Sequence, residues 1–202
     1  MWSFLGDTPV ILASASPRRK AILQNAGLKF TIRPVEVGED ILPGELPFSI
    51  AMNNAQNKAD AAADFEANEW IIAADTVVAL GKRIIGKPKN AKDAFRILTA
   101  LSGETHTVYT GFAILNSYSL GSYYDFDTAE VTFYKLSPQE IETYIATGEP
   151  LDKAGAYGIQ AQGGLLVKSI QGDHFNVAGL PVAKLRCDWI SNYKELIRVR
   201  HR

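Results

Sequence analysis

The stretch WIIAADTVVAL, residues 70–80, constrains the fold more than any other part of the sequence. Apolar and β-branched residues stand at almost every position, so both faces of an extended segment would be apolar. This pattern is typical of a strand that is buried on both sides of a sheet. Asp75 interrupts the run, where strands disfavour aspartate and an ionised carboxylate is costly to bury unless it is paired. The sequence therefore predicts a covered sheet with one buried carboxylate.

The rest of the chain alternates between helix-like and strand-like segments, which predicts an α/β fold with a mixed, twisted sheet. Helix starts are marked by Ser16-Pro17, by Asn90 and by the capping-box pattern of Ser137 and Glu140. The expected helices cover residues 17–26, 48–63, 91–101, 138–147 and 181–193, and the expected strands cover residues 10–13, 30–35, 70–80, 83–85, 105–115, 123–136 and 165–170. The glycine-rich segment 148–164 is expected to be a loop.

With 202 residues the chain is long enough for one sizeable domain, and no repeat or low-complexity linker divides it. We expect a single domain over residues 1–202, with residues 1–9 and 194–202 peripheral. The formal net charge of −1 gives no global indication of a nucleic-acid partner, and no apolar run approaches the length of a membrane span. The lone Cys187 excludes an intramolecular disulfide and a cysteine-based zinc site. These features favour a cytoplasmic protein without a nucleic-acid or membrane partner.

The segment SASPRR, residues 14–19, lies where a predicted strand gives way to a predicted helix. Backbone N–H groups and the dipole at a helix N-terminus attract anions. Arg18 and Arg19 add two guanidinium groups, which bind phosphate in a bidentate manner. The same residues also fit a solvated helix start whose arginines pair with nearby acids. The residues alone fit both interpretations, phosphate binding and a solvated helix start.

Two interpretations also fit Asp75. A carboxylate that is costly to bury is often a metal ligand or a base, which we favour, but it also occurs as a hydrogen-bonded residue that holds a loop. Glu36, Glu39 and Asp40 form an acidic cluster after the second predicted strand. Such loop carboxylates are ordinarily solvated, and they gain a role only if they converge with Asp75 on a divalent cation.

The segment GKRIIGKP, residues 81–88, has the G-x-x-x-x-G-K spacing of a phosphate-binding P-loop. Pro88 follows where that motif requires Ser or Thr, and no helix begins there. The spacing alone favours a hairpin with a surface lysine, Lys87. A second polar segment, GEPLDKAGAYGIQ at residues 148–160, is dense in glycine, which indicates a small-molecule pocket that a backbone approaches closely.

Eight motifs follow one another in the order ILASASPRRKAIL, NKA, AADTVV, GKP, LSGETHTVYTG, EVTF, GEPLDKAGAYGIQ and GDHFNVAGLP. In this order, from about residue 10 to 189, the chain closely resembles the Maf family of nucleoside triphosphate pyrophosphatases. The resemblance implies two lobes around a central cleft, similar to the inosine triphosphate pyrophosphatases of the Ham1 type. It also implies hydrolysis of a nucleoside triphosphate to the monophosphate and pyrophosphate, with Mg²⁺ or Mn²⁺ as a cofactor.

The resemblance assigns roles to individual residues. Asp75 would be the proton acceptor. The residues implied to bind the substrate are Ser14, Arg18, Arg19, Lys58, Thr76, Lys87, Lys153 and Gln160. The residues implied to hold the divalent cation are Glu39, Asp75 and Asp152. For Lys87, the resemblance replaces the interpretation as a surface lysine with a contact to phosphate.

The resemblance extends to the substrate. One branch of the family acts on dTTP and UTP, and its specificity positions hold Arg, Thr and Gln, which Arg18, Thr76 and Gln160 match. We therefore expect a dTTP and UTP pyrophosphatase, with modified pyrimidine nucleotides as further candidates. Two alternatives stay open: an enzyme for noncanonical purine triphosphates, and a division-regulating protein that binds nucleotides without turnover. A homodimer is also left open.

Overall fold

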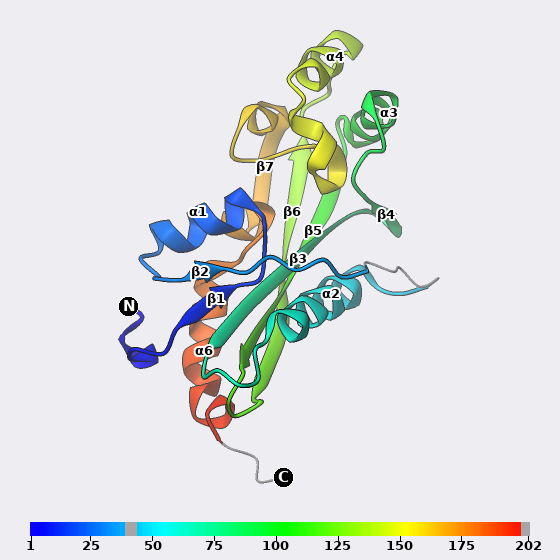
Figure 1. Ribbon diagram of the computed structural model, residues 1–202. Helices are drawn as coiled ribbons and strands as arrows, with labels where there is room; N and C mark the ends of the chain where they lie inside the picture. Colours follow the sequence, from blue (N-terminus) through cyan, green and yellow to red (C-terminus); the bar gives the residue numbers. More distant parts are fainter. Residues whose placement is uncertain (39–43, 199–202) are drawn as a thin grey trace. The chain divides into compact units, whose positions relative to one another are not determined.

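The computed structural model describes residues 1–38 and 44–198, in which helices and strands alternate along the chain (Figure 1). The strands are β1 (Val10–Leu12), β2 (Thr31–Ile32), β3 (Trp70–Leu80), β4 (Arg83–Ile85), β5 (Thr105–Asn116), β6 (Ser122–Phe133) and β7 (Val167–Gly172). The helices are α1 (Pro17–Asn25), α2 (Pro47–Ala62), α3 (Ala91–Leu101), α4 (Pro138–Ala146), α5 (His174–Val177) and α6 (Val182–Leu196). Short 3₁₀ turns are η1 (Ser3–Leu5), η2 (Glu149–Asp152), η3 (Ala154–Ala156) and η4 (Gln162–Leu166). Within these described ranges, no helix has the length and apolar character needed to cross a bilayer.

The strands form a mixed sheet in the order β2-β1-β3-β5-β6-β7, and β4 pairs with β3 outside this path. β1 runs parallel to both β2 and β3, whereas the β3–β4 and β6–β7 pairs are antiparallel. This topology confirms the predicted α/β class with a mixed sheet.

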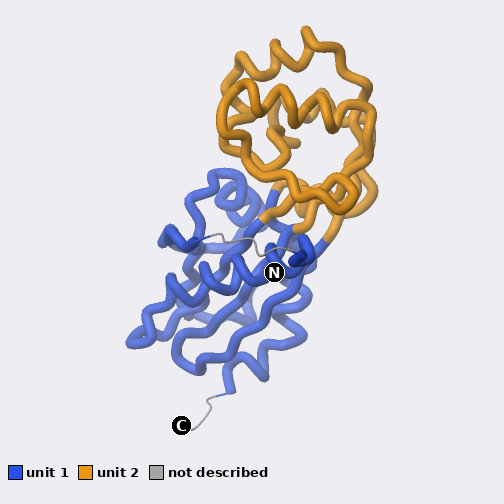
Figure 2. The backbone as a smooth tube through the Cα atoms, turned by 90° about the vertical axis from the view of Figure 1, so that its right-hand side faces the viewer, with its two compact units in different colours: residues 1–75, 110–127, 179–202 blue, residues 76–109, 128–178 orange. Residues whose placement is uncertain are grey.

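The chain divides into two compact units, which Figure 2 colours separately. Unit 1 comprises residues 1–75, 110–127 and 179–202, and unit 2 comprises residues 76–109 and 128–178. The expected single domain with peripheral ends stays a prediction, and residues 199–202 of its C-terminal segment fall outside the described chain.

Local signals place several elements where the sequence predicts them. β3 and β4 have the predicted limits, and Asn90 caps α3 by accepting a hydrogen bond from the backbone of Asp93. The capping box at the start of α4 is formed. β2 is shorter than expected because its partner β1 has only three residues and because Pro34, which follows, has no N–H to donate. The single turn α5 was not expected, since one turn is too short for a periodic pattern.

In unit 1, the two faces of β3 pack against different helices. Ile71 and Ala73 belong to a cluster with the alanines of α2. Trp70, on the opposite face, packs edge-on against Trp189 of α6, with 5.2 Å between the ring centroids. Because side chains alternate along a strand, Asp75 shares the face of Ile71 and Ala73, which α2 covers.

The helix α2 approaches the sheet closely because small residues form its inner face. Ala51, Ala55 and Ala59 are almost fully buried. A Cβ atom on Gly111 of β5 would lie 2.3 Å from the backbone carbon and oxygen of Ala51, so no larger residue fits there. The distance between α2 and the sheet therefore depends on Gly111.

We predict that Gly111→Ala destabilises the protein by roughly 2–4 kcal/mol, because the added methyl group must push the α2 backbone away from the sheet. The free energy of unfolding, measured by urea denaturation, gives the effect. Gly86→Ala is the matched control, since a Cβ atom there meets nothing within 4 Å. Equal stability of the two variants would contradict the prediction.

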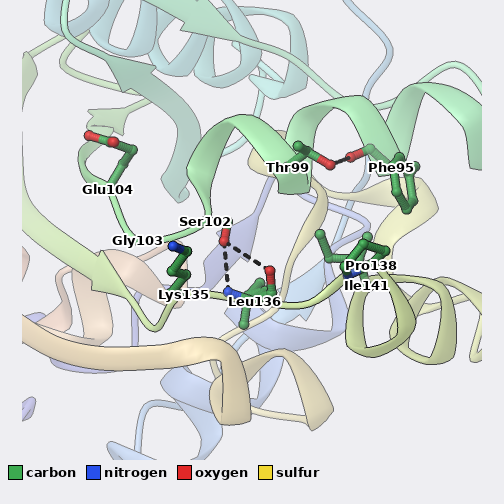
Figure 3. Close-up of a pocket in the computed structure, with 9 residues that line it drawn as sticks. All are labelled: Phe95, Thr99, Ser102, Gly103, Glu104, Lys135, Leu136, Pro138 and Ile141. Carbon is green, nitrogen blue, oxygen red and sulfur yellow. Dashed lines mark hydrogen bonds between the residues drawn. The ribbon is translucent and has the colours of Figure 1, made fainter.

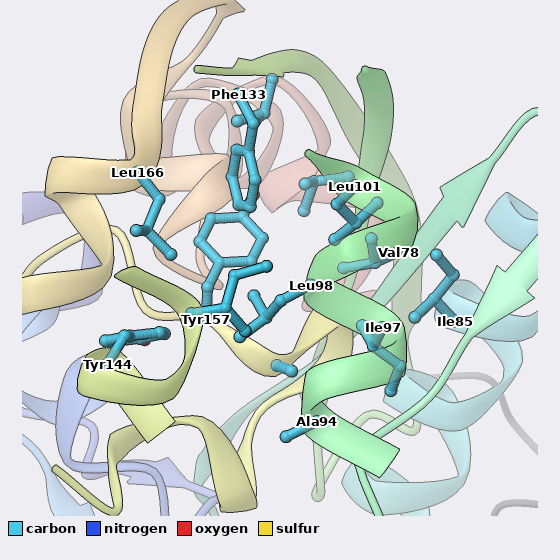
Figure 4. Packing of buried hydrophobic residues seen from close by; sticks show 14 residues of the cluster. Val78, Ile85, Ala94, Ile97, Leu98, Leu101, Phe133, Tyr144, Tyr157 and Leu166 are labelled. Carbon is cyan, nitrogen blue, oxygen red and sulfur yellow. The ribbon is translucent and has the colours of Figure 1, made fainter. Parts of the chain in front are cut away.

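The core of unit 2 gathers side chains from α3, α4, the strands and the loop that follows α4 (Figure 4). Phe133 of β6 and Tyr157 of the loop pack edge-on, with 4.8 Å between the ring centroids. The Nε2 atom of His106 lies 2.9 Å from the Tyr157 hydroxyl, and both side chains are buried. This pair anchors the loop in the core of unit 2.

The buried His106 makes stability depend on pH. Burial lowers the pKa of His106 from 6.5 to about 4. Between these values the unfolded chain binds a proton that the folded chain excludes, so stability falls as the pH falls. Unfolding free energies measured from pH 7 to pH 4 should lose roughly 3 kcal/mol through this group. His106→Gln should show a correspondingly weaker slope, and parallel slopes for the two proteins would contradict the assignment.

Candidate active site

Asp75 is held by two side chains of α2. Its Oδ1 atom lies 2.6 Å from the Nζ atom of Lys58, and its Oδ2 atom accepts a hydrogen bond of 3.0 Å from the Nδ2 atom of Asn54. The side chains of Lys58 and Asp75 are each 12% exposed. The ion pair therefore compensates the charge of a largely buried carboxylate, and the two donors fix the orientation of its plane.

This arrangement leaves acceptor positions free on both oxygens of Asp75. Each carboxylate oxygen offers two acceptor positions, and each accepts one of these two donors. Both oxygens thus retain capacity for a proton or a hard cation. Sequence reasoning missed Asn54, although it precedes Lys58 by four residues and so lies on the same face of α2.

The start of α1 forms a second group in unit 1. Ser16 caps the helix by accepting from the backbone N–H of Arg19. The hydroxyl of Ser14 accepts from the backbone N–H of Ser16 at 3.2 Å and from a guanidinium nitrogen of Arg19 at 3.3 Å. The Nε atom of Arg19 donates to the carbonyl oxygen of Gly179 at 2.8 Å. The structure therefore brings Ser14 and Arg19 together and orients the arginine.

Two predicted phosphate-binding cations, Arg18 and Lys87, have no side-chain partner among the described residues. Within residues 1–38 and 44–198, neither Arg18 in unit 1 nor Lys87 in unit 2 makes a side-chain hydrogen bond or an ion pair. Arg18 is half-buried and Lys87 is exposed. A cation without a counter-charge retains its full capacity to bind an anion.

The loop after α4 carries the remaining candidates of unit 2. Lys153 donates to the carboxylate of Asp152 at 2.6 Å and to the carbonyl oxygen of Glu149 at 2.7 Å. Gln160 is exposed, and its side-chain amide bonds to no residue in the described part of the chain. The backbone N–H of Gly155 donates to the carbonyl oxygen of Gly86 at 3.2 Å, so the loop lies next to the segment that carries Lys87.

Thr76, the remaining substrate candidate, follows Asp75 on β3 and is the first residue of unit 2. Its side chain is half-buried.

The predicted cation ligands are carboxylates, the donors that Mg²⁺ and Mn²⁺ prefer. Asp75 and Asp152 each pair with a lysine, and Glu39 is outside the described residues. Residues 1–38 and 44–198 contain no cluster of three His, Cys, Asp or Glu side chains suited to a metal ion. The donor chemistry of Asp75 fits a hard cation, but the described carboxylates alone do not complete a coordination sphere.

Unit 2 also contains a cavity of about 540 Å³ between α3 and α4 (Figure 3). Its lining residues are Phe95, Thr99, Ser102, Gly103, Glu104, Lys135, Leu136, Pro138 and Ile141. The hydroxyl of Ser102 already bonds to the backbone of Leu136, and none of the predicted site residues lines this cavity. The cavity is therefore separate from the candidate site.

The mixed sheet, the anion-attracting start of α1 and the buried Asp75 define an α/β protein with features suited to phosphate chemistry. Residues 9–188 match the family model described as Maf-like protein. The chain belongs to this family.

Two relatives named dTTP/UTP pyrophosphatase come from Bacillus mycoides (strain KBAB4) and Bacillus cytotoxicus (strain DSM 22905 / CIP 110041 / 391-98 / NVH 391-98). Each is 47% identical to this chain, over 176 and 175 residues respectively, which cover 87% of this chain and 91% of the relative. A solved structure titled nucleoside-triphosphatase / dITP/XTP pyrophosphatase, from Mycobacterium abscessus, is 11% identical and has a TM-score of 0.42. That alignment covers 93% of this chain and 96% of the other.

We predict that the Lys58–Asp75 pair shows strong energetic coupling. Lys58→Met leaves the Asp75 carboxylate largely buried without a counter-charge, which should destabilise the protein by roughly 3 kcal/mol. The double variant Lys58→Met/Asp75→Asn should be less destabilised than Lys58→Met alone, because no charge remains. Unfolding free energies of the wild type, both single variants and the double variant measure the coupling.

The exposed pair of Arg96 and Asp93 provides a control, since the Arg96 side chain is 63% exposed. Arg96→Met should change the unfolding free energy by less than about 1 kcal/mol. Additive effects at Lys58 and Asp75 would show that the buried pair is not coupled.

Proposed function

We propose that this chain hydrolyses dTTP and UTP to the nucleoside monophosphate and pyrophosphate. Membership of the Maf-like family and relatives named dTTP/UTP pyrophosphatase at 47% identity support the reaction class and the substrate. Arg18, Thr76 and Gln160 stand at the positions that the dTTP and UTP branch resemblance assigns to specificity.

The geometry around Asp75 is the observation that carries the proposed chemistry. Lys58 and Asn54 hold a largely buried carboxylate in one orientation, and its oxygens retain capacity to accept a proton. In the proposed reaction a water oxygen forms a bond to the α-phosphorus, and the bond from this phosphorus to the oxygen bridging to the β-phosphate breaks. Asp75 takes the proton of the water, and pyrophosphate leaves.

Charge neutralisation and positioning account for most of the catalysis of such a reaction. We assign the phosphate contacts to the start of α1, with Ser14, Arg18 and Arg19, and to Lys87 and Lys153 in unit 2. Arg18 and Lys87 support this role best, because neither is neutralised by a side chain of the described residues. Lys58, which pairs with Asp75, serves mainly to hold the base.

A divalent cation, Mg²⁺ or Mn²⁺, belongs to the same proposal. Asp75, Asp152 and Glu39 are its proposed ligands, together with phosphate oxygens. When bound, the cation would neutralise charge on the phosphate groups. We also propose a cytoplasmic location, and a homodimer is left open.

Recognition of the base is assigned to the loop of unit 2. The exposed amide of Gln160 both donates and accepts, so it matches the edge of a pyrimidine, which carries groups of both kinds. Gly155 of this loop has a φ of 74°, which other residues rarely adopt, and it packs against Val78 and Tyr157.

A nucleotide panel tests the proposal. The protein is incubated with dTTP, UTP, CTP and canonical and noncanonical purine triphosphates in Mg²⁺ or Mn²⁺, and monophosphate and pyrophosphate are quantified. We expect the highest kcat/KM for dTTP and UTP. Higher values for noncanonical purine triphosphates would favour the purine alternative, and tight binding without product under all metals would favour the nucleotide-binding regulator.

Asp75→Asn tests the assignment of the base. The substitution keeps the shape of the side chain and removes its basic oxygen, so kcat should fall by roughly 10³-fold or more while the nucleotide is still bound. Asp7→Asn, which makes the same change at an exposed position, should retain wild-type kcat. Substantial turnover by Asp75→Asn would exclude Asp75 as the base.

A further inference from the structure

The loop of residues 148–164 in unit 2 has little regular structure to fix its shape. It consists of 3₁₀ turns joined by irregular segments, and it carries Asp152, Lys153 and Gln160. A specificity residue on such a loop is useful only if the backbone on both sides of it is held in place. The hydrogen bonds within the loop identify the residue that holds it.

Glu149 connects the two ends of this loop. Its Oε1 atom accepts a hydrogen bond of 3.0 Å from the Tyr144 hydroxyl and one of 3.3 Å from the backbone N–H of Gly163. Its Oε2 atom accepts a hydrogen bond of 3.1 Å from the backbone N–H of Gln162. One carboxylate thus ties the beginning of the loop to residues 13 and 14 positions further along the chain.

Tyr144 extends the same closure to the middle of the loop. Its hydroxyl, which donates to Glu149, accepts from the backbone N–H of Gly158 at 3.2 Å. Tyr144 is buried in the core of unit 2 and belongs to the same cluster as Tyr157 (Figure 4). Burial raises the pKa of Tyr144, so the phenol stays a neutral donor.

Two glycines of the loop, Gly158 and Gly163, are required by this closure. A Cβ atom on Gly158 would lie 3.0 Å from Oε1 of Glu149, and one on Gly163 would lie 2.5 Å from the Tyr144 hydroxyl. The backbone therefore packs directly against the Tyr144–Glu149 pair. The loop is closed by contacts that leave no space for larger residues at these two positions.

We propose that Glu149 is a positioning residue that presents Gln160 to the nucleobase, an inference that rests on the proposed function. Gln160 lies between Gly158 and Gln162, whose backbone N–H groups are both fixed by the Tyr144–Glu149 pair. Gln160 itself bonds to no side chain or backbone group of the described residues, so the flanking contacts determine where its amide lies. Glu149 therefore controls selection between nucleobases without contacting one.

The kind of donor separates this role from that of a base or a metal ligand, since two of the three donors to Glu149 are backbone N–H groups. The two oxygens of Glu149 receive three donors, and these donors are themselves fixed in the loop and in the core. Oε1 accepts two of these donors and Oε2 accepts one, so a group that binds Glu149 through Oε1 would displace a contact that closes the loop. Glu149 is thus committed to structure at the site, and its effect on catalysis passes through Gln160.

The test combines substrate selectivity with a double-mutant cycle. In Glu149→Ala, the ratio of kcat/KM for dTTP to kcat/KM for a noncanonical purine triphosphate should fall roughly ten-fold, because Gln160 is no longer held. Gln160→Ala should lower the same ratio, and Glu149→Ala/Gln160→Ala should lower it no further than either single variant. Additive losses, or an unchanged ratio in Glu149→Ala, would overturn the proposal.

Glu142→Ala is the matched control, since Glu142 is an exposed glutamate of α4 whose side chain bonds to no described residue. It should leave the ratio unchanged. Glu149→Gln should recover part of the selectivity, because the amide oxygen still accepts one of the donors while its NH₂ group faces backbone N–H groups. A purely structural role would instead lower kcat/KM equally for all nucleotides.

Amide hydrogen exchange tests the closure independently of any activity. The backbone N–H groups of Gly158, Gln162 and Gly163 should exchange at least ten-fold faster in Glu149→Ala than in the wild type or Glu142→Ala. Unchanged exchange would overturn the closure of the loop by Glu149, which we call the clamp, even if the wild type hydrolyses dTTP. Faster exchange in a protein that hydrolyses no nucleotide would confirm the clamp and refute only the proposed function and the selectivity that rests on it.

Discussion

The burial of Asp75 is the constraint on which the arrangement of unit 1 depends. A carboxylate in the middle of an apolar strand needs a counter-charge, and the alternation of side chains along β3 directs it toward α2. Lys58 and Asn54, which lie four residues apart on one face of α2, donate to this carboxylate. Both reach the carboxylate only because α2 lies close to the sheet, and the approach requires alanines on the helix and Gly111 on β5. The apolar packing and the polar contacts therefore specify the same position of α2.

The same carboxylate explains why a buried ion pair occurs where an apolar pair would pack more simply. Replacing a buried pair with apolar residues often costs nothing in stability, so stability is a weak reason for the Lys58–Asp75 pair. A fixed carboxylate whose oxygens retain acceptor capacity is instead what proton transfer requires. Lys58 is therefore best understood as the counter-charge that allows a charged carboxylate to stay at this point of the sheet.

Local patterns allowed much of the fold to be predicted from the sequence, whereas the contacts of the candidate site could not be. The limits of β3 and the caps at Asn90 and Ser137 depend on neighbouring residues, and the structure agrees with them. The partners of Asp75 and the clamp of Glu149 join residues that are distant in the sequence, and residue types alone do not specify such pairs. Even so, the sequence already contained the position of Asp75 on the same face of β3 as Ile71 and Ala73, and the four-residue spacing of Asn54 and Lys58. These two features predict the contacts of Asp75 only once it is known that α2 covers that face of β3.

Asp75 and Glu149 show how hydrogen-bond donors separate two uses of one chemical group. Asp75 receives two donors from side chains and keeps acceptor capacity on each oxygen. Glu149 receives three donors, two of them from the backbone, and these contacts close a loop. A carboxylate that binds backbone N–H groups fixes the path of the chain, since moving it would leave those groups unsatisfied. A carboxylate held by side chains alone is oriented without fixing the backbone, so Asp75 can bind a proton or a cation without opening a loop.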